Sequence, residues 1–302
     1  MIVWLASYPR SGNTLLRILL HQTLAITSYA EHNHPIVENE MTGGFLVFQD
    51  GWETFYQKAS DSTDAVFVKT HHPPKDDQPA IYVVRDGRKV YTSYAAFHQR
   101  FSGPRGPSLL ELVLGLDYYG SWSDHFRAWA PAQRGNTLLL RYEDLVQPSA
   151  SCLAQIAGFL GQGVPPKSWQ NPFKRLQAMD AGFFRQGETR WRGDPAWSDP
   201  IDALFFQRNG TLMQELGYAS QDEVSLAGSQ LAPELSELGG IVQRLAATGK
   251  ALEGACQERL SLIESLSRTC DERLALIQEL DRACRDRDRI IDSLSPERPA
   301  RS

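Results

Sequence analysis

Apolar and polar residues follow one another along residues 1–219 in a pattern that predicts strands and helices in turn. Continuous apolar runs, such as Ile2 to Ala6 and Ile81 to Val84, are typical of strands that are buried on both faces. We expect strands near residues 2–7, 65–69, 80–85 and 137–141. Helices are expected near residues 14–27, 52–59, 87–100, 108–130, 149–161 and 201–216. This alternation predicts an α/β fold, in which helices flank a parallel sheet.

The C-terminal residues carry a different pattern. Segments that begin at Cys256, Cys270 and Cys284 are near-repeats with a period of fourteen residues. Fourteen residues are two heptads, so equivalent positions return to the same face of a supercoiled helix. One phase holds Leu252, Leu266, Leu280 and Leu294, and neighbouring phases hold Leu260, Ile263, Leu274, Ile277 and Ile291. The pattern predicts a helical coiled-coil tail that makes the chain a homo-oligomer or docks a partner. Because arginine and aspartate residues enter the seam, a solvated single helix is the alternative.

These patterns divide the chain into three parts. Residues 1–219 form the α/β domain, and residues 251–302 form the helical tail. The stretch 220–250 between them is rich in Ser, Gly and Ala, which is typical of a linker.

The most informative local motif is Ser-Tyr-Pro-Arg-Ser-Gly-Asn-Thr at residues 7–14, between the first strand and the first helix. A tight turn in this place presents backbone N–H groups to a phosphate, and Gly12 lets the backbone approach an anion. Arg10 adds a positive charge, and side-chain donors come from Ser11, Asn13 and Thr14. The turn predicts a P-loop-like site for a phosphate-bearing ligand. It lacks the Gly-Lys-Ser/Thr ending of the common nucleotide loop, which argues against ATP hydrolysis.

A second motif lies at the end of the strand near 80–85. Arg85 ends this apolar run, and Ser93 follows about two helical turns later. Ligands of parallel sheets bind outside the carboxyl ends of the strands. Arg85 and the loop at 7–14 are therefore expected at the same edge.

Composition and charge exclude several classes of protein. The formal net charge is −5, which argues against a nucleic-acid partner. No basic leader and no run of about 20 apolar residues is present, so neither a signal peptide nor a membrane span is expected. Cys152 lies in an apolar helical pattern, and the other three cysteines lack zinc-ligand spacing. These features together indicate a cytoplasmic protein.

The two motifs resemble those of the cytosolic-type sulfotransferases, which use 3′-phosphoadenosine-5′-phosphosulfate (PAPS). Residues 8–14 are similar to the family's loop for the 5′-phosphosulfate, and residues 82–93 to its Arg-x7-Ser motif for the 3′-phosphate. Further similar stretches, in the family's order, are Val-Lys-Thr-His at 68–71, Tyr-Glu-Asp-Leu at 142–145 and Phe-Arg-Gln-Gly at 184–187. The resemblance covers residues 1 to about 219.

The resemblance implies that the chain transfers a sulfuryl group from PAPS to an acceptor hydroxyl and releases adenosine 3′,5′-bisphosphate (PAP). The implied catalytic residues are His71, Lys69 and Arg10. The implied cofactor-binding residues are Arg10, Ser11, Gly12, Asn13, Thr14, Arg85, Ser93, Tyr142, Phe173, Arg185, Gln186 and Gly187. Arg10 and Gln186 stand where the family usually has lysine. Leu15 replaces a stacking aromatic residue, which leaves adenine stacking to Phe173.

The chemistry requires a base for the acceptor's proton, and histidine, with an ordinary pKa near 6.5, suits it. His71 matches the family's position, and its neighbour His72 is the rival because adjacent side chains diverge. Lys69 is expected over the sulfuryl group and Arg10 at the leaving-group oxygen. Arg and Lys cations supply the charge stabilisation, so no metal is required.

Other interpretations remain open at this point. A kinase on a similar fold is disfavoured by the missing Gly-Lys-Ser/Thr. A non-catalytic scaffold is disfavoured by the presence of Lys69, His71, Arg85 and Ser93 together. The polar stretch 31–38, with Glu31, His32, His34 and Glu38, is expected to be an exposed loop rather than a metal site. Phe97 or Phe101 is a candidate for an acceptor pocket, and the acceptor itself, a small molecule or a glycan, is not identified by the sequence.

Overall fold

A five-stranded parallel sheet forms the centre of the molecule. The computed structural model describes residues 1–30, 51–103, 106–161, 167–181, 191, 194–229 and 233–294. The sheet order is β2-β3-β1-β4-β5, and all four neighbouring pairs are parallel. The strands are β1 (Ile2–Ser7), β2 (Ser28–Tyr29), β3 (Val66–Thr70), β4 (Ala80–Val84) and β5 (Thr137–Arg141). The predicted parallel sheet with flanking helices is confirmed, and the short β2 is an addition to it.

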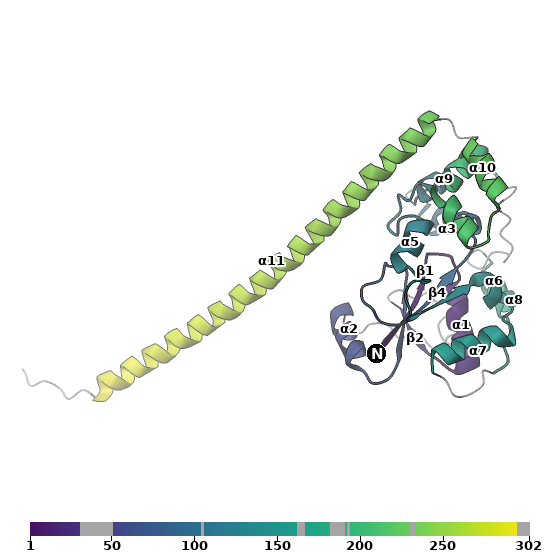
Figure 1. The fold of residues 1–302 in the computed structure, drawn as a ribbon. Coiled ribbons are helices and arrows are strands. Elements are labelled where there is room, and N and C mark those ends of the chain that lie inside the picture. The colour runs from purple at the N-terminus through teal and green to yellow at the C-terminus, as the bar shows by residue number, and fades with distance from the viewer. Residues whose placement is uncertain are drawn as a thin grey trace, which may run out of the picture. The chain divides into compact units, whose positions relative to one another are not determined.

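The period-two alternation of β1 divides the core into two layers. Val3 and Leu5 belong to one hydrophobic cluster, whereas Ile2, Trp4 and Ala6 belong to the other. The first cluster includes side chains of α1 (Asn13–Leu24), α6 (Tyr142–Val146) and α7 (Ala150–Phe159). Figure 1 labels these three helices. The second includes side chains of α2 (Trp52–Asp61), α3 (Gly87–Phe101), α4 (Leu109–Val113), α5 (Trp122–Trp129) and α9 (Asp199–Glu215). Helices therefore cover both faces of the sheet, as its continuous apolar strands require.

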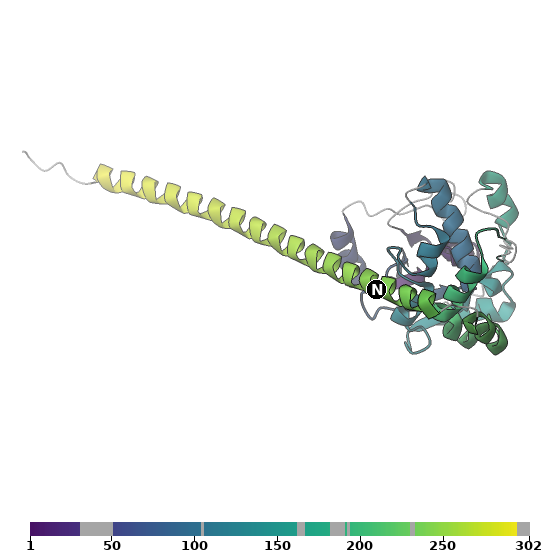
Figure 2. The same ribbon diagram turned by 90° about the horizontal axis from the view of Figure 1, so that it is seen from above.

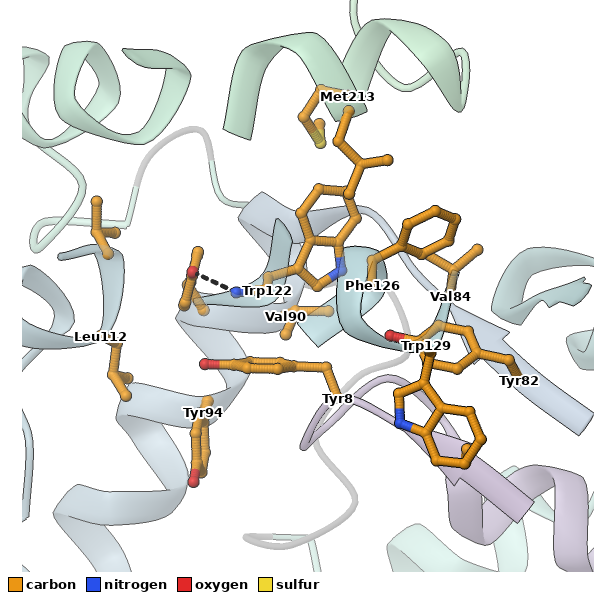
Figure 3. Close-up of a cluster of buried hydrophobic side chains, with 14 of the residues drawn as sticks. Tyr8, Tyr82, Val84, Val90, Tyr94, Leu112, Trp122, Phe126, Trp129 and Met213 are labelled. Atoms are coloured by element: carbon orange, nitrogen blue, oxygen red, sulfur yellow. Dashed lines mark hydrogen bonds between the residues drawn. The ribbon is translucent and has the colours of Figure 1, made fainter. Parts of the chain in front are cut away.

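Aromatic side chains dominate the second layer (Figure 3). Tyr8, Tyr82, Trp122 and Trp129 are each at most 1% exposed. The Trp122 backbone N–H donates to the Tyr91 hydroxyl at 2.9 Å, which fixes the start of α5 against α3. Side chains of this size bury about 150–250 Å² each and dominate core energetics.

The single helix expected over residues 108–130 is two helices in the structure, α4 and α5. Gly115 and Gly120 lie between them with φ of 72° and 73°, a left-handed conformation that interrupts a helix. Ser121 then caps α5 by accepting a hydrogen bond from the Asp124 backbone N–H at 3.1 Å. The glycines override the apolar periodicity that runs through this stretch.

The stretch 220–250, expected to be a linker, is helical from Gln221 onward wherever the structure describes it. It holds α10 (Gln221–Ser229) and the first part of α11 (Pro233–Leu294). Ala227 of α10 is buried in the second core layer, and Glu223 pairs with Arg88 at 3.5 Å. A Cβ atom on Gly210 of α9 would come within 2.9 Å of Val224, so α10 packs closely on α9. Tertiary packing therefore decides the structure of residues that composition alone assigns to a linker.

The short helix α8 (Phe173–Met179) was also absent from the sequence expectations.

Contacts divide the chain into two compact units, Met1–Gln243 and Arg244–Ser302. The helix α11 is continuous over its 62 residues (Figures 1 and 2). Its apolar residues are exposed: Leu266 and Leu280 are each 57% exposed, and Ile263 and Ile277 are each 62% exposed. In the part of the chain that the structure describes, no helix is both long and apolar enough to cross a bilayer.

A chain that ends at Gln243 should unfold at the same temperature as the first unit of the full chain. A chain that ends at Ser220 should unfold at least about 5 °C lower, because it loses the buried Ala227 and the packing of Val224, roughly 2 kcal/mol. Circular dichroism melts of the two shortened chains check this. Equal melting temperatures would show that α10 adds nothing to the stability of the core.

Candidate functional site

The loop that joins β1 to α1 holds two residues in the left-handed conformation. Arg10 has φ of 64° and Gly12 has φ of 109°. Gly12 is the N-cap of α1, where no side chain caps the helix. The Asn13 side-chain amide instead donates to the Leu5 carbonyl at 2.7 Å and so ties the first helical residue to β1. An uncapped helix start with its N–H groups towards the loop is suited to an anion.

Two buried features shape this loop further. Ser11 is fully buried, and its hydroxyl has no hydrogen-bond partner in the described part of the protein. Tyr142, the first residue of α6, lies against Gly12, where a Cβ atom would come within 2.4 Å of the ring. The loop therefore requires glycine at this position for two reasons, its backbone angle and the nearby ring. Thr14, also predicted as a ligand, is half-buried in the first turn of α1.

Arg10, Arg85 and Ser93 meet at the carboxyl edge of the sheet. The Arg10 Nε donates to the Ser93 hydroxyl at 3.3 Å, and the Arg85 guanidinium donates to the Arg10 carbonyl at 3.2 Å. The Arg85 guanidinium also lies 4.2 Å from the centroid of the Tyr142 ring. The predicted loop and the predicted Arg85–Ser93 pair are thus brought together. Arg10, which we expected at the leaving-group oxygen, directs its guanidinium to Ser93.

His71 directly follows β3 and is held by the end of β1. Its Nδ1 lies 2.7 Å from the Ser7 carbonyl oxygen. A carbonyl only accepts, so Nδ1 carries the proton and Nε2 holds the lone pair of the neutral ring. Burial, with the nearby Lys69 cation, lowers the pKa of His71 well below 6.5. The ring is therefore neutral at pH 7.

Two consecutive hydrogen bonds from buried side chains hold the backbone carbonyl of His71. The Tyr82 hydroxyl donates to His125 Nδ1 at 2.8 Å, and His125 Nε2 donates to the His71 carbonyl at 2.9 Å. Burial lowers the pKa of His125 to about 4 and keeps this ring neutral as well. His125 is not among the residues predicted from the sequence, because nothing local to α5 indicates that its ring reaches the residue after β3.

A pocket of about 340 Å³ opens beside His71. It is lined by Trp4, Trp52, Lys69, Thr70, His71, His72, Pro73, Lys75, Tyr118, Tyr119 and Trp129. Lys69 and His71 thus share this cavity, as their spacing of two residues predicts. His72 lies edge-on to Tyr118, with ring centroids 5.6 Å apart. Phe97 and Phe101 do not line the pocket: Phe97 lies against Arg10, and Phe101 is 49% exposed.

The remaining predicted site residues are Phe173 and three residues that lie outside the described part of the chain. Phe173 begins α8 and is half-buried. Arg185, Gln186 and Gly187 lie outside the described residues, as does the polar stretch 31–38. Among the residues that the structure describes, no group of three or more His, Cys, Asp or Glu side chains is placed to hold a metal ion.

Comparison with known proteins places the chain in a family. The model of the sulfotransferase domain family matches residues 2–181. Sulfotransferase 2A1 of Macaca fascicularis is 30% identical over 182 residues, which cover 55% of this chain and 61% of that protein. Sulfotransferase 4A1 of Mus musculus is 26% identical over 184 residues, which cover 53% of this chain and 59% of that protein. The chain thus spans about 60% of the length of these curated relatives.

Solved structures give a more distant likeness. A mouse sulfotransferase, SULT7A1, complexed with PAP, has a TM-score of 0.48 at 18% identity and covers 72% of this chain and 89% of its own. Retinol dehydratase in complex with androsterone and inactive cofactor PAP has a TM-score of 0.40 at 18% identity, over 81% of this chain and 80% of its own. The family model matches more than half of the chain, so the protein belongs to the sulfotransferase domain family.

Replacing Gly12 with alanine should destabilise the protein by about 1–3 kcal/mol, because alanine is strained at φ of 109° and its Cβ atom would meet Tyr142. Gly158→Ala is the matched control. Gly158 lies in α7, a Cβ atom built there would meet no atom within 4 Å, and alanine has a higher helix propensity than glycine. Urea unfolding of both variants measures the difference. A Gly12→Ala variant as stable as Gly158→Ala would show that the loop relaxes away from Tyr142.

Proposed function

We propose that this chain transfers a sulfuryl group from PAPS to an acceptor hydroxyl, with His71 as the general base. The observation that carries the proposal is the hydrogen bond from His71 Nδ1 to the Ser7 carbonyl. It joins a neutral imidazole base to the strand from which the anion-binding loop leaves. The pocket next to His71 gives an acceptor room to approach Nε2.

The residues present fit a nucleotide with phosphates at two positions. The uncapped start of α1 and the buried Ser11 hydroxyl suit the 5′-phosphosulfate, together with Gly12, Asn13 and Thr14. Arg85 and Ser93 suit the 3′-phosphate, and Tyr142 lies against the Arg85 guanidinium. Phe173 as the adenine-stacking residue, and Arg185, Gln186 and Gly187 as further ligands, remain predictions from the family resemblance.

The transfer needs a proton acceptor and compensation for negative charge. PAPS, when bound, supplies the sulfuryl group and leaves as PAP. His71 Nε2 takes the proton of the acceptor hydroxyl, while Nδ1 stays bound to the Ser7 carbonyl and fixes the ring. Lys69 lines the same pocket and stabilises the developing negative charge, and Arg10 adds a second cation beside Ser93.

The His71→Ala variant should lose roughly 10²-fold or more in turnover while its affinity for PAP stays unchanged, because the ring acts on the acceptor. In the wild type, the pKa of His71 lies well below 6.5, so the ring becomes protonated only when the pH falls below that value. The acidic fall in kcat/KM should therefore lie below that pH. Initial rates with labelled PAPS from pH 5 to 8 measure turnover and its pH dependence. Titrations with PAP measure the affinity.

His72→Ala is the control for this experiment, since its ring lies in the same pocket without the bond to Ser7. The base would be His72 instead if His72→Ala were the crippling change and His71→Ala were mild. An acidic fall centred above pH 6.5 in the wild type would contradict the environment described for His71.

We also propose that α11 self-associates as a coiled coil. Its exposed leucine and isoleucine residues recur in heptads over residues 252–291, and association would remove this stripe from water. Cys256, Cys270 and Cys284 are free and exposed on this helix. They would persist as thiols in a reducing compartment, which is consistent with the proposed cytoplasmic location.

Light scattering under reducing conditions should give a dimer or larger species for the full chain and a monomer for a chain that ends at Gln243. The shorter chain lacks residues 252–291 and keeps only Leu235, Leu238 and Ile241 of the exposed apolar residues of α11, too few for a stable coiled coil. A monomeric full chain would make α11 a solvated helix or a docking helix for another protein.

A further inference from the structure

The pocket beside His71 has aromatic walls. Trp4 and Trp129 are 3% and 1% exposed and form its buried part, whereas Tyr118 is 70% exposed and lies at its rim. Both buried indole N–H groups are occupied: Trp4 donates to Asp76 at 2.8 Å, and Trp129 donates to the His72 carbonyl at 2.9 Å. These two tryptophans therefore form an apolar floor, and the more exposed rings of Trp52, Tyr118 and Tyr119 supply the walls of the pocket. Such walls suit a flat, apolar ring.

The polar groups that line the pocket carry positive charge or are neutral. Lys69 and Lys75 contribute ammonium groups, and no carboxylate is among the described lining residues. Three acids, Glu53, Asp76 and Asp117, each adjoin a lining residue in the sequence, but none of them lines the pocket. Asp76 accepts from the Trp4 indole and the Tyr56 hydroxyl, both at 2.8 Å, and Asp117 accepts from the Tyr94 hydroxyl at 2.9 Å. The pocket is thus suited to a ligand that carries negative charge.

Lys75 is the cation that sulfuryl transfer does not require. It lies on the loop after His72, where Pro73 and Pro74 restrict the backbone. Its ammonium lies 4.7 Å from the Trp52 ring centroid, so it is held over an aromatic wall of the pocket. The side chain is exposed at the rim and available to a ligand.

We infer that the acceptor is a hydroxylated aromatic acid. Its ring packs between the aromatic walls, its hydroxyl lies at His71, and its carboxylate pairs with Lys75. The inference rests on the proposed function, because it assigns the acceptor of that same site. Lys75 is then a specificity-determining residue: it selects the anionic acceptor and takes no part in the transfer.

The test compares three phenols that differ in charge: 4-hydroxyphenylacetate, its neutral amide, and the cationic amine tyramine. Labelled PAPS reports transfer by the full chain. The wild type should favour the acid over the amide by about tenfold in kcat/KM. Lys75→Met should lower kcat/KM for the acid at least about fivefold and leave the amide within about twofold. Lys75→Glu should change the preference to tyramine.

Lys58→Met is the matched control, since Lys58 is exposed on α2 and does not line the pocket. It should keep the preference for the acid. Equal rates for acid and amide in the wild type, or equal losses for both in Lys75→Met, would overturn the inference. Transfer to none of the three phenols, with PAP still bound, would also overturn it and leave the cofactor site standing. Failure to bind PAP at all would instead overturn the proposed function.

Discussion

The site depends on the hydrogen bond between His71 Nδ1 and the Ser7 carbonyl. Ser7 ends β1 and His71 follows β3, and these strands are parallel neighbours in which Ala6 is paired with Thr70. The pairing brings the loop at 8–12 and His71 to one edge of the sheet, although more than fifty residues separate them. The same bond selects the imidazole tautomer and leaves the lone pair on Nε2. A strand slip of one residue would break all of these relationships together.

The surroundings of this bond concentrate positive charge. The acids that follow Arg85 and Tyr142 in the sequence bind other groups. Asp86 caps α3 and pairs with Arg88 at 2.9 Å, and Glu143 accepts a hydrogen bond from the Tyr218 hydroxyl at 2.8 Å. His71 and His125 stay neutral because burial lowers the pKa of both. The cations of the site are therefore arginine and lysine side chains. Such an arrangement suits the anionic nucleotide and the anionic acceptor that we propose.

Much of this architecture could be predicted because it is encoded locally. Continuous apolar runs locate β1, β3, β4 and β5, and parallel strands bring their carboxyl ends together, which places Arg85 near the loop. Features set by distant contacts could not be predicted. Gly115 and Gly120 divide one apolar stretch into two helices through backbone angles that the pattern does not report.

Long-range packing explains the other differences between expectation and structure. Tyr142 reaches Gly12 across 130 residues, and His125 reaches His71 across 54. Neither contact leaves a local signal in the sequence. Residues 221–229 are helical because α10 buries Ala227 and packs on α9, which outweighs their linker-like composition.

The central claim is that Arg85, Ser93 and the loop after β1 form a site for a nucleotide with a 3′-phosphate. Thermal unfolding of the full chain with equal concentrations of PAP or ATP tests it most directly, since ATP lacks that phosphate. At about a hundred times its Kd, PAP should add about 2.7 kcal/mol of stability and raise the Tm by about 5 °C or more. ATP should raise it clearly less. Equal or greater stabilisation by ATP would contradict the account.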